Sequence, residues 1–194
     1  YVHIELDKIF RQRDERFIAI LNNFRNSNVT KADLAALNKH YRTDEEIHTD
    51  GIITLTTHNN KADALNNDAL NKLPGPPRIY DAKVEGDFPE SMYPLPKRLE
   101  LRVGAQVMFT RNDAEKEYFN GKLACVTRIT PDSIQVAMAD DGATYDLTRV
   151  TWENKRYVLQ GETQEFGEEV IGTYVHYPVK LAWAITVHKS QGLT

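Results

Sequence analysis

Three polar clusters in the sequence contain residue types that bind phosphate groups. In the first, Arg11-Gln12, the planar guanidinium can donate two parallel hydrogen bonds to one phosphate. The second cluster runs from Thr56 to Asn60 and the third from His188 to Gly192, and both mix hydroxyl, amide and imidazole donors. Donors of these kinds suit the backbone phosphates and sugar edges of a nucleic acid.

Each cluster also has a purely structural explanation, which the sequence leaves open. Arg11 could lie on the solvated face of a helix, residues 56–60 could form a turn that caps a helix, and residues 188–192 could form a loop. Trp152 and Tyr157 could stack on bases, as aromatic side chains do in single-strand binders, or they could belong to the core or its rim.

Helical spacing dominates the first part of the chain. Residues 4–26 are expected to form a helix with an apolar stripe that includes Phe17 and Leu21. Thr30, with Asp33 three positions later, predicts the start of a short second helix that buries Leu34 and Leu37.

A strand followed by a helix is expected next. Residues 51–57 are short and β-branched, which indicates a buried strand. Apolar residues from Ala62 to Leu73 then share one helical face until Pro74-Gly75-Pro76-Pro77 ends the helix. Strand, polar turn and helix together make one unit of an α/β sheet.

The later part of the chain is predicted to be β-rich. Residues 74–98 are rich in proline and charged side chains and suggest an exposed connection. Short strand patterns over 103–110, 123–129, 133–138 and 144–147 then favour a small barrel or sandwich, with Cys125 interpreted as a small core residue. In the tail, Leu181 to His188 fit both helical spacing and strand alternation, and Pro178 favours a helix start.

Composition narrows the class of protein. The 194 residues contain 24 Lys and Arg against 28 Asp and Glu, a net charge of −4, which excludes a basic coat over the whole surface but permits a local basic groove. One cysteine excludes an internal disulfide framework and fits an intracellular protein. The sequence shows no membrane-length apolar stretch, signal peptide, Walker-type phosphate loop, zinc-helix signature or nucleophile elbow.

The end of the sequence resembles a known motif. Residues 181–194, LAWAITVHKSQGLT, closely resemble motif V of the PIF/RecD branch of superfamily 1 DNA helicases. Residues 6–12 resemble motif IV of that branch, and residues 55–59, with Ala62, Asp63 and Asn66, resemble the motif that follows it. Residues 103–108 and 112–121 resemble the entry to its SH3-like insert, and the resemblance is weakest over residues 74–98.

The resemblance implies an α/β fold, part of a RecA-like P-loop NTPase motor domain interrupted by a small all-β SH3-like barrel. Residues 1–98 would begin the second RecA-like domain, residues 99–177 would form the barrel, and residues 178–194 would return to the motor domain. Such a helicase would hydrolyse ATP with Mg²⁺, translocate along single-stranded DNA, 5′ to 3′, and unwind duplex.

Roles for individual residues follow from the same resemblance. Arg11 would be catalytic by contacting the ATP γ-phosphate, with Gln12 and Gly192 also near the nucleotide. The implied contacts to single-stranded DNA are Thr56, Thr57, His58, Asn59, Asn112, Asn120, Lys122, His188, Lys189, Ser190 and Gln191.

Two departures from the family pattern limit these expectations. The sequence shows no Walker lysine and no Mg²⁺-holding acidic motif, which belong to the first RecA-like domain, and no motif VI arginine after Thr194. The chain alone is therefore expected to hold no ATP or metal, to be inactive, and to act with that first domain, in a bacterial cytoplasm and without a membrane. The alternative is a non-motor module in which the barrel binds a nucleic acid or a peptide.

Overall fold

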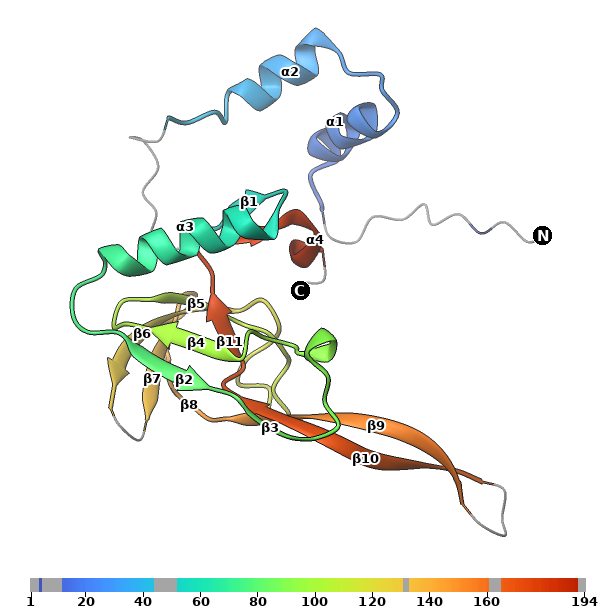
Figure 1. Ribbon diagram of the computed structural model, residues 1–194. Coiled ribbons are helices and arrows are strands. Elements are labelled where there is room, and N and C mark those ends of the chain that lie inside the picture. Colours follow the sequence, from blue (N-terminus) through green and yellow to red (C-terminus); the bar gives the residue numbers. More distant parts are fainter. Residues whose placement is uncertain (1–3, 5–11, 44–51, 131–132, 161–164, 192–194) are drawn as a thin grey trace. The chain divides into compact units, whose positions relative to one another are not determined.

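The computed structural model describes residues 4, 12–43, 52–130, 133–160 and 165–191 (Figure 1). The chain divides into two compact units, residues 1–48 and residues 49–194. Each unit is considered by itself.

The first unit contains two capped helices. In α1 (Glu15–Arg25), the Asp14 carboxylate accepts hydrogen bonds from the backbone N–H groups of Arg16 and Phe17, so the helix begins later than the predicted residue 4. Residues 12–14 are not helical, and residues 5–11 lie outside the described residues.

The second helix confirms the predicted cap but not the predicted burial. In α2 (Lys31–Asn38), the Thr30 hydroxyl accepts from the Asp33 N–H while the Asp33 carboxylate accepts from the Thr30 N–H, a reciprocal capping box. The helix buries no residue completely, and Leu34 is 47% exposed, so the prediction that it is buried was wrong.

The predicted strand and helix are present in the second unit. Strand β1 (Thr54–Thr56) is followed by α3 (Asn59–Lys72), which buries Ala62, Asn66 and Leu70. The helix ends before Pro74, where Leu73 adopts the extended conformation that a residue before proline prefers. In β1 only Thr56 is buried, and Leu55 is 56% exposed, so the prediction of a buried strand was wrong for Thr54 and Leu55.

The tail supplies the partner of β1. Residues expected to be helical form strands β11 (Val179–Leu181) and β12 (Ala184–Thr186), and only α4 (Val187–Ser190) is helical. Strand β12 pairs with β1 in parallel, in a register that sets Thr54 beside Ala184 and Thr56 beside Thr186. The helix prediction for the tail was therefore wrong over both strands, because pairing with distant strands decides a pattern that fits either structure.

The proline-rich segment is more ordered than expected. It contains β2 (Arg78–Asp81), β3 (Lys83–Gly86) and a 3₁₀ turn (Glu90–Met92), and it leads into β4 (Arg98–Leu101), the antiparallel partner of β2. Ala82, Phe88 and Leu95 are buried, so the prediction of an exposed connection was wrong.

A five-stranded antiparallel sheet holds the main core. Its order is β11, β5 (Gln106–Phe109), β6 (Leu123–Ile129), β7 (Ile134–Met138) and β8 (Thr144–Leu147), and in the described part of the chain the strands do not close into a barrel. On β6 the buried side chains of Ala124 and Val126 alternate with Cys125, which is exposed. The expectation of a core cysteine was wrong, because neighbouring residues of a strand face opposite sides.

A long hairpin completes the second unit. Strands β9 (Val150–Gln160) and β10 (Glu165–His176) pair along their length, with β3 on the other side of β10, and they extend away from the five-stranded sheet (Figure 1). Trp152 is partly buried 5.9 Å from the ring of Tyr174, whereas Tyr157 is 71% exposed. None of the helices in the described ranges is long and apolar enough to cross a membrane. The fold is thus α/β, with a parallel strand pair, a covering helix and a larger antiparallel part.

Candidate nucleic-acid interface

The parallel pairing of β1 and β12 brings two of the three predicted clusters together. Both strands run in the same direction, and Thr56 lies beside Thr186 at their carboxyl ends. The residues that follow therefore leave from one edge of the strand pair, Thr57 to Asn59 after β1 and His188 to Gln191 after β12. Polar groups at the carboxyl ends of parallel strands are a common arrangement for binding ligands.

On the β1 side, the predicted residues differ in what they can offer. The buried Thr56 hydroxyl donates to the carbonyl of His58 at 3.1 Å and lies 3.5 Å from that of Ile185, so it stabilises the turn. The Thr57 hydroxyl and the His58 Nδ1 atom lie 2.8 Å apart, and both residues are exposed. His58 stands at the N-cap of α3 with no side-chain cap bond, and Asn59 is the first residue of that helix.

On the β12 side, α4 presents exposed polar groups. His188 and Lys189 are exposed, and Ser190 is half-buried, with its hydroxyl donating to the Val187 carbonyl at 2.6 Å. The backbone N–H of Gln191 donates to the His188 carbonyl at 3.3 Å, which closes the turn. Together with Thr57 to Asn59, these residues form a surface that we name the strand-end edge: Thr57, His58, Asn59, His188, Lys189, Ser190 and Gln191.

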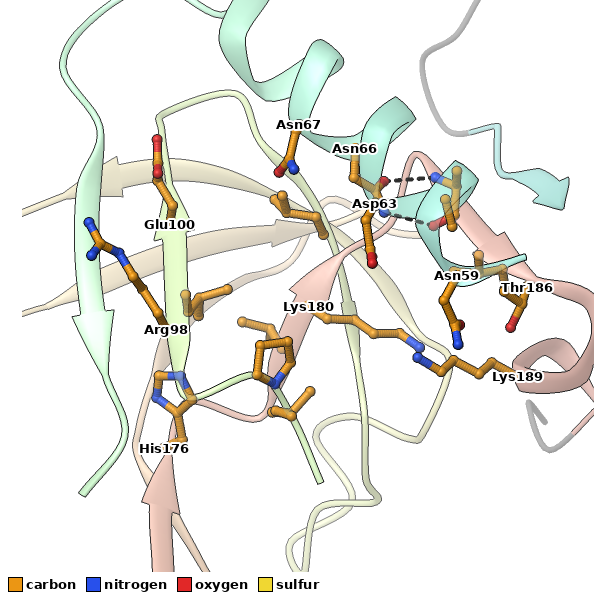
Figure 2. A pocket seen from close by; sticks show the side chains of 18 residues that line it. Asn59, Asp63, Asn66, Asn67, Arg98, Glu100, His176, Lys180, Thr186 and Lys189 are labelled. Carbon is orange, nitrogen blue, oxygen red and sulfur yellow. Dashed lines mark hydrogen bonds between the residues drawn. The ribbon is translucent and has the colours of Figure 1, made fainter. Parts of the chain in front are cut away.

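A cavity of about 420 Å³ lies between α3, β4, β11 and the end of β12. Asn59 and Lys189 belong both to this cavity and to the strand-end edge. Figure 2 shows the side chains of Lys180 and Lys189 pointing toward each other inside it, with Asp63 on the α3 side. Burial, and then the charge of Lys189, lower the pKa of Lys180. Lys180 was not among the site residues predicted from the sequence. The strand alternation considered for the tail would place Lys180 and Leu181 on opposite faces of a strand, and this was the available signal.

Side-chain amides hold the strands that lead to this edge. The Asn66 side chain accepts from the Ala184 N–H at 2.8 Å and donates to the Ala184 carbonyl at 2.9 Å (Figure 2). In addition, Gln106 donates to the carbonyls of Ile52 and Ala182, at 3.0 and 2.9 Å. In the sequence, Asn66 was named only as part of a motif. Its place on the apolar face of α3, between Ala62 and Leu70, was the sign that it is buried and has a structural role.

A buried histidine lies at the far end of the cavity. His176 has no exposed surface, and neither ring nitrogen has a hydrogen-bond partner in the part of the chain that the structure describes. Burial is the main cause that lowers the pKa of His176 to about 4, and the charge of Arg149 lowers it further against the opposing effect of Asp81. The imidazole is therefore neutral at pH 7.

The predicted contacts from the β-rich part lie elsewhere, on the loop between β5 and β6. The Asn112 side chain accepts from the Asn120 N–H at 2.8 Å, which fixes the loop. The Lys122 ammonium, with a side chain 13% exposed, lies 3.4 Å from the Asp140 carboxylate and 6.0 Å from the centre of the Phe119 ring. These contacts explain the three residues structurally, and their role in DNA binding remains a prediction.

The predicted nucleotide residues are only partly described. Arg11 and Gly192 lie outside the described residues, and Gln12 is exposed ahead of α1 in the first unit. Within the described ranges, no group of three or more His, Cys, Asp or Glu side chains could hold a metal ion.

Known proteins are similar to this chain along its whole length. No protein-family model matches the chain. It is 33% identical over its whole length to a zebrafish (Danio rerio) ATP-dependent DNA helicase PIF1, of which it covers 30%. It is 41% identical to the crystal structure of Bacteroides sp. Pif1 in complex with ADP-AlF4, with a TM-score of 0.83 over 96% of this chain and 43% of that one.

A second state of the bacterial relative is also similar. The Bacteroides Pif1 structure bound to single-stranded DNA is 42% identical and has a TM-score of 0.70, over 98% of this chain and 43% of that one. The chain therefore spans less than half the length of the relatives it matches. Identity along the whole chain, together with the shared structure, shows that the chain is similar over its whole length to one part of Pif1 helicases.

Proposed function

We propose that this chain is the second RecA-like part of an ATP-dependent DNA helicase that translocates on single-stranded DNA and unwinds duplex. The observation that carries the proposal is the strand-end edge, where the parallel pairing of β1 and β12 unites two polar clusters. A relative of similar structure is bound to single-stranded DNA, which supports the same ligand here.

In this proposal the strand-end edge holds the DNA backbone. Thr57, His58 and Asn59 on one side, and His188 to Gln191 on the other, supply hydroxyl, imidazole, amide and ammonium donors. Contacts of this kind position a strand without reading its sequence. Asn112, Asn120 and Lys122 would add contacts from the β5–β6 loop.

The proposed domain division has an SH3-like insert over residues 99–177 between two motor segments, residues 1–98 and 178–194. The strand pairings support a close association of these parts. Strand β11 of the return segment pairs with β5, and β2 of the first segment pairs with β4. The β-rich block would therefore move together with the motor segment that carries the strand-end edge.

ATP and Mg²⁺ would be held mainly by a first RecA-like domain of the same protein. The 194 residues contain no Walker-type phosphate loop, and the described residues contain no cluster of metal ligands. Bound there, ATP with Mg²⁺ would supply the phosphoryl-transfer chemistry for movement. Arg11 would bring its guanidinium to the γ-phosphate, with Gln12 and Gly192 near the nucleotide, and a location in the bacterial cytoplasm accords with this function.

Binding to labelled oligo(dT), measured by fluorescence anisotropy at several salt concentrations, tests the proposal. We expect weak binding that falls steeply between about 50 and 200 mM salt, because each phosphate contact releases counterions. Changing both His188 and Lys189 to alanine should weaken binding at least about tenfold and reduce the salt slope. Lys72→Ala is the matched control, because Lys72 is exposed on α3 and forms an ion pair with Asp68 of the same helix.

Two outcomes would contradict the proposal. Affinity unchanged by the double substitution would remove α4 from the DNA surface. If binding is unaffected by the double substitution but lost in Lys122→Ala, a non-motor module that binds through the β5–β6 loop would be favoured.

A further inference from the structure

Two lysine side chains converge in the cavity beside the strand-end edge. Lys180 extends from β11 and Lys189 from α4, and Figure 2 shows their ammonium groups directed at each other. In the described ranges, neither ammonium forms an ion pair or a hydrogen bond. Like charges that approach each other repel, and an anion bound between the two ammonium groups would relieve this repulsion.

The charges around the pair do not neutralise it. Asp63 also lines the cavity from α3, and Arg98 and Glu100 line it from β4. The pKa of Lys180 is lowered by burial first and by the charge of Lys189 second, with no carboxylate raising it. The positive potential at the two ammonium groups is therefore left for a ligand.

The remaining polar groups of this end suit a phosphate. Asn59, the first residue of α3, and Thr186, the last residue of β12, line the same part of the cavity. Amide and hydroxyl groups beside two ammonium groups are the donors that phosphate oxygens accept from. At about 420 Å³, the cavity is large enough to admit a phosphodiester.

We propose that Lys180 and Lys189 bind one phosphate group between them, and that this phosphate belongs to the backbone of single-stranded DNA that continues past the strand-end edge. The inference rests on the proposed function for the source of the phosphate. It adds Lys180, on β11, to a contact surface otherwise built from the ends of β1 and β12.

Continuity of the two surfaces favours the DNA backbone over a free phosphate ion. Asn59 and Lys189 belong to both the cavity and the strand-end edge. A strand held at His58 and His188 therefore has its neighbouring phosphate within the reach of Lys189, whose partner across the cavity is Lys180. A free ion would not require this continuity.

The first test measures DNA affinity and stability together in Lys180→Met. Methionine keeps the apolar stem of the side chain and removes its charge. We expect affinity for labelled oligo(dT) to fall about three- to tenfold and the salt slope to fall by about one phosphate contact. The melting temperature should stay the same or rise, because a repulsion is removed. A structural role alone would lower stability and leave the salt slope unchanged.

Two matched variants control for general charge and for side-chain size. Lys72→Met removes an exposed lysine of α3 outside the cavity and should leave oligo(dT) affinity within about twofold. Lys180→Arg keeps a cation in the cavity and should retain most of the affinity. Full loss in Lys180→Arg, or an equal loss in Lys72→Met, would overturn the assignment.

A titration followed by NMR distinguishes a DNA phosphate from a free phosphate ion as the ligand of the two lysines. The ε-methylene resonance of Lys180 is followed by NMR while inorganic phosphate or oligo(dT) is added to the chain. A shift with oligo(dT) at concentrations where inorganic phosphate has no effect supports the proposal. A shift with phosphate alone, and an unchanged DNA affinity in Lys180→Met, would overturn the DNA source.

Failure of the proposed function gives a different result. If the chain binds no oligo(dT) at low salt, the proposed function is wrong, and so is the DNA source of the phosphate. If the chain binds oligo(dT) through His188 and Lys189 but Lys180→Met changes neither affinity nor salt slope, only the present inference is overturned.

Discussion

The side chain of Asn66 takes the place of a neighbouring strand beside β12. Its amide oxygen accepts from the Ala184 N–H at 2.8 Å and its amide nitrogen donates to the Ala184 carbonyl at 2.9 Å. Ala184 is 1% exposed and Asn66 is 8% exposed, so water does not compete freely for these groups. We predict that Asn66→Ala strongly destabilises the second unit.

The expected size follows from the two groups left without a partner. An unsatisfied buried donor or acceptor costs about 1–3 kcal/mol, and a truncated side chain at a strand edge admits some water. We therefore expect Asn66→Ala to lower the free energy of unfolding by about 2–4 kcal/mol, a large share of the usual stability of a domain. Asn66→Asp should be no better, because its carboxylate cannot donate to the Ala184 carbonyl.

Urea unfolding followed by tryptophan fluorescence measures this effect. Both tryptophans, Trp152 and Trp183, lie in the second unit, so the signal reports on that unit alone. Asn67→Ala is the matched control, because Asn67 is the next residue of α3 and is exposed. A difference between the two variants of less than about 0.5 kcal/mol would refute the reasoning, since exposed substitutions commonly vary by that much.

Three further predictions concern stability. The pKa of His176 is lowered from 6.5 to about 4, so below pH 6.5 the unfolded chain binds more protons than the folded one. Stability should therefore fall as pH drops from 6.5 toward 4, by at most about 1.4 kcal/mol per pH unit, and His176→Phe should show a shallower slope in the same urea assay. Thr30→Ala removes the capping box of α2 and should cost about 1 kcal/mol, read by circular dichroism at the helix band, whereas Thr30→Ser should cost little. Gly172→Ala should cost about 3 kcal/mol, because the added Cβ would clash with the backbone carbonyl oxygen of Asp87. Gly75→Ala, with no atom within 4 Å of the added Cβ, should cost only about 1 kcal/mol for its positive φ, and equal losses in the two variants would contradict the clash.

Local signals predicted the elements whose causes lie close in sequence. The capping box at Thr30, the end of α3 before Pro74 and the alternating strand over residues 134–138 each depend on neighbours within a few positions. The turn at Asp140 to Gly142 is likewise local, and its glycine adopts a φ of +71°. These features could be predicted from the sequence and are present in the structure.

Long-range pairing explains what could not be predicted. Strand β3 pairs with β10 and β11 pairs with β5, across separations that no local pattern records. The proline-rich segment and the tail therefore become strands, although their local residues suggested a connection and a helix. Cys125 is exposed for a similar reason, since only the sheet determines which face of β6 is buried.

In the candidate site, too, local signals indicated the residue types, whereas long-range contacts decide which residues come together. The residue types at Thr57 to Asn59 and at His188 to Lys189 indicated phosphate binding, but only the pairing of β1 with β12 places them on one edge. Lys180 and Asn66 were not singled out as functional residues, because their significance depends on Lys189 and Ala184, which come from other segments.

Side-chain amides make the strand-end edge a fixed platform rather than two independent loops. In the part of the chain that the structure describes, β1 and β12 form a two-stranded sheet, and such a pair is marginally stable by itself in water. Asn66 satisfies the free side of β12, and Gln106 joins the carbonyls of Ile52 and Ala182, one ahead of each strand. Because these amides belong to α3 and β5, the edge is positioned by both the helix and the five-stranded sheet. In the proposed function these groups would hold a DNA strand and would have to keep their spacing, and rigid elements hold binding groups more accurately than loops do.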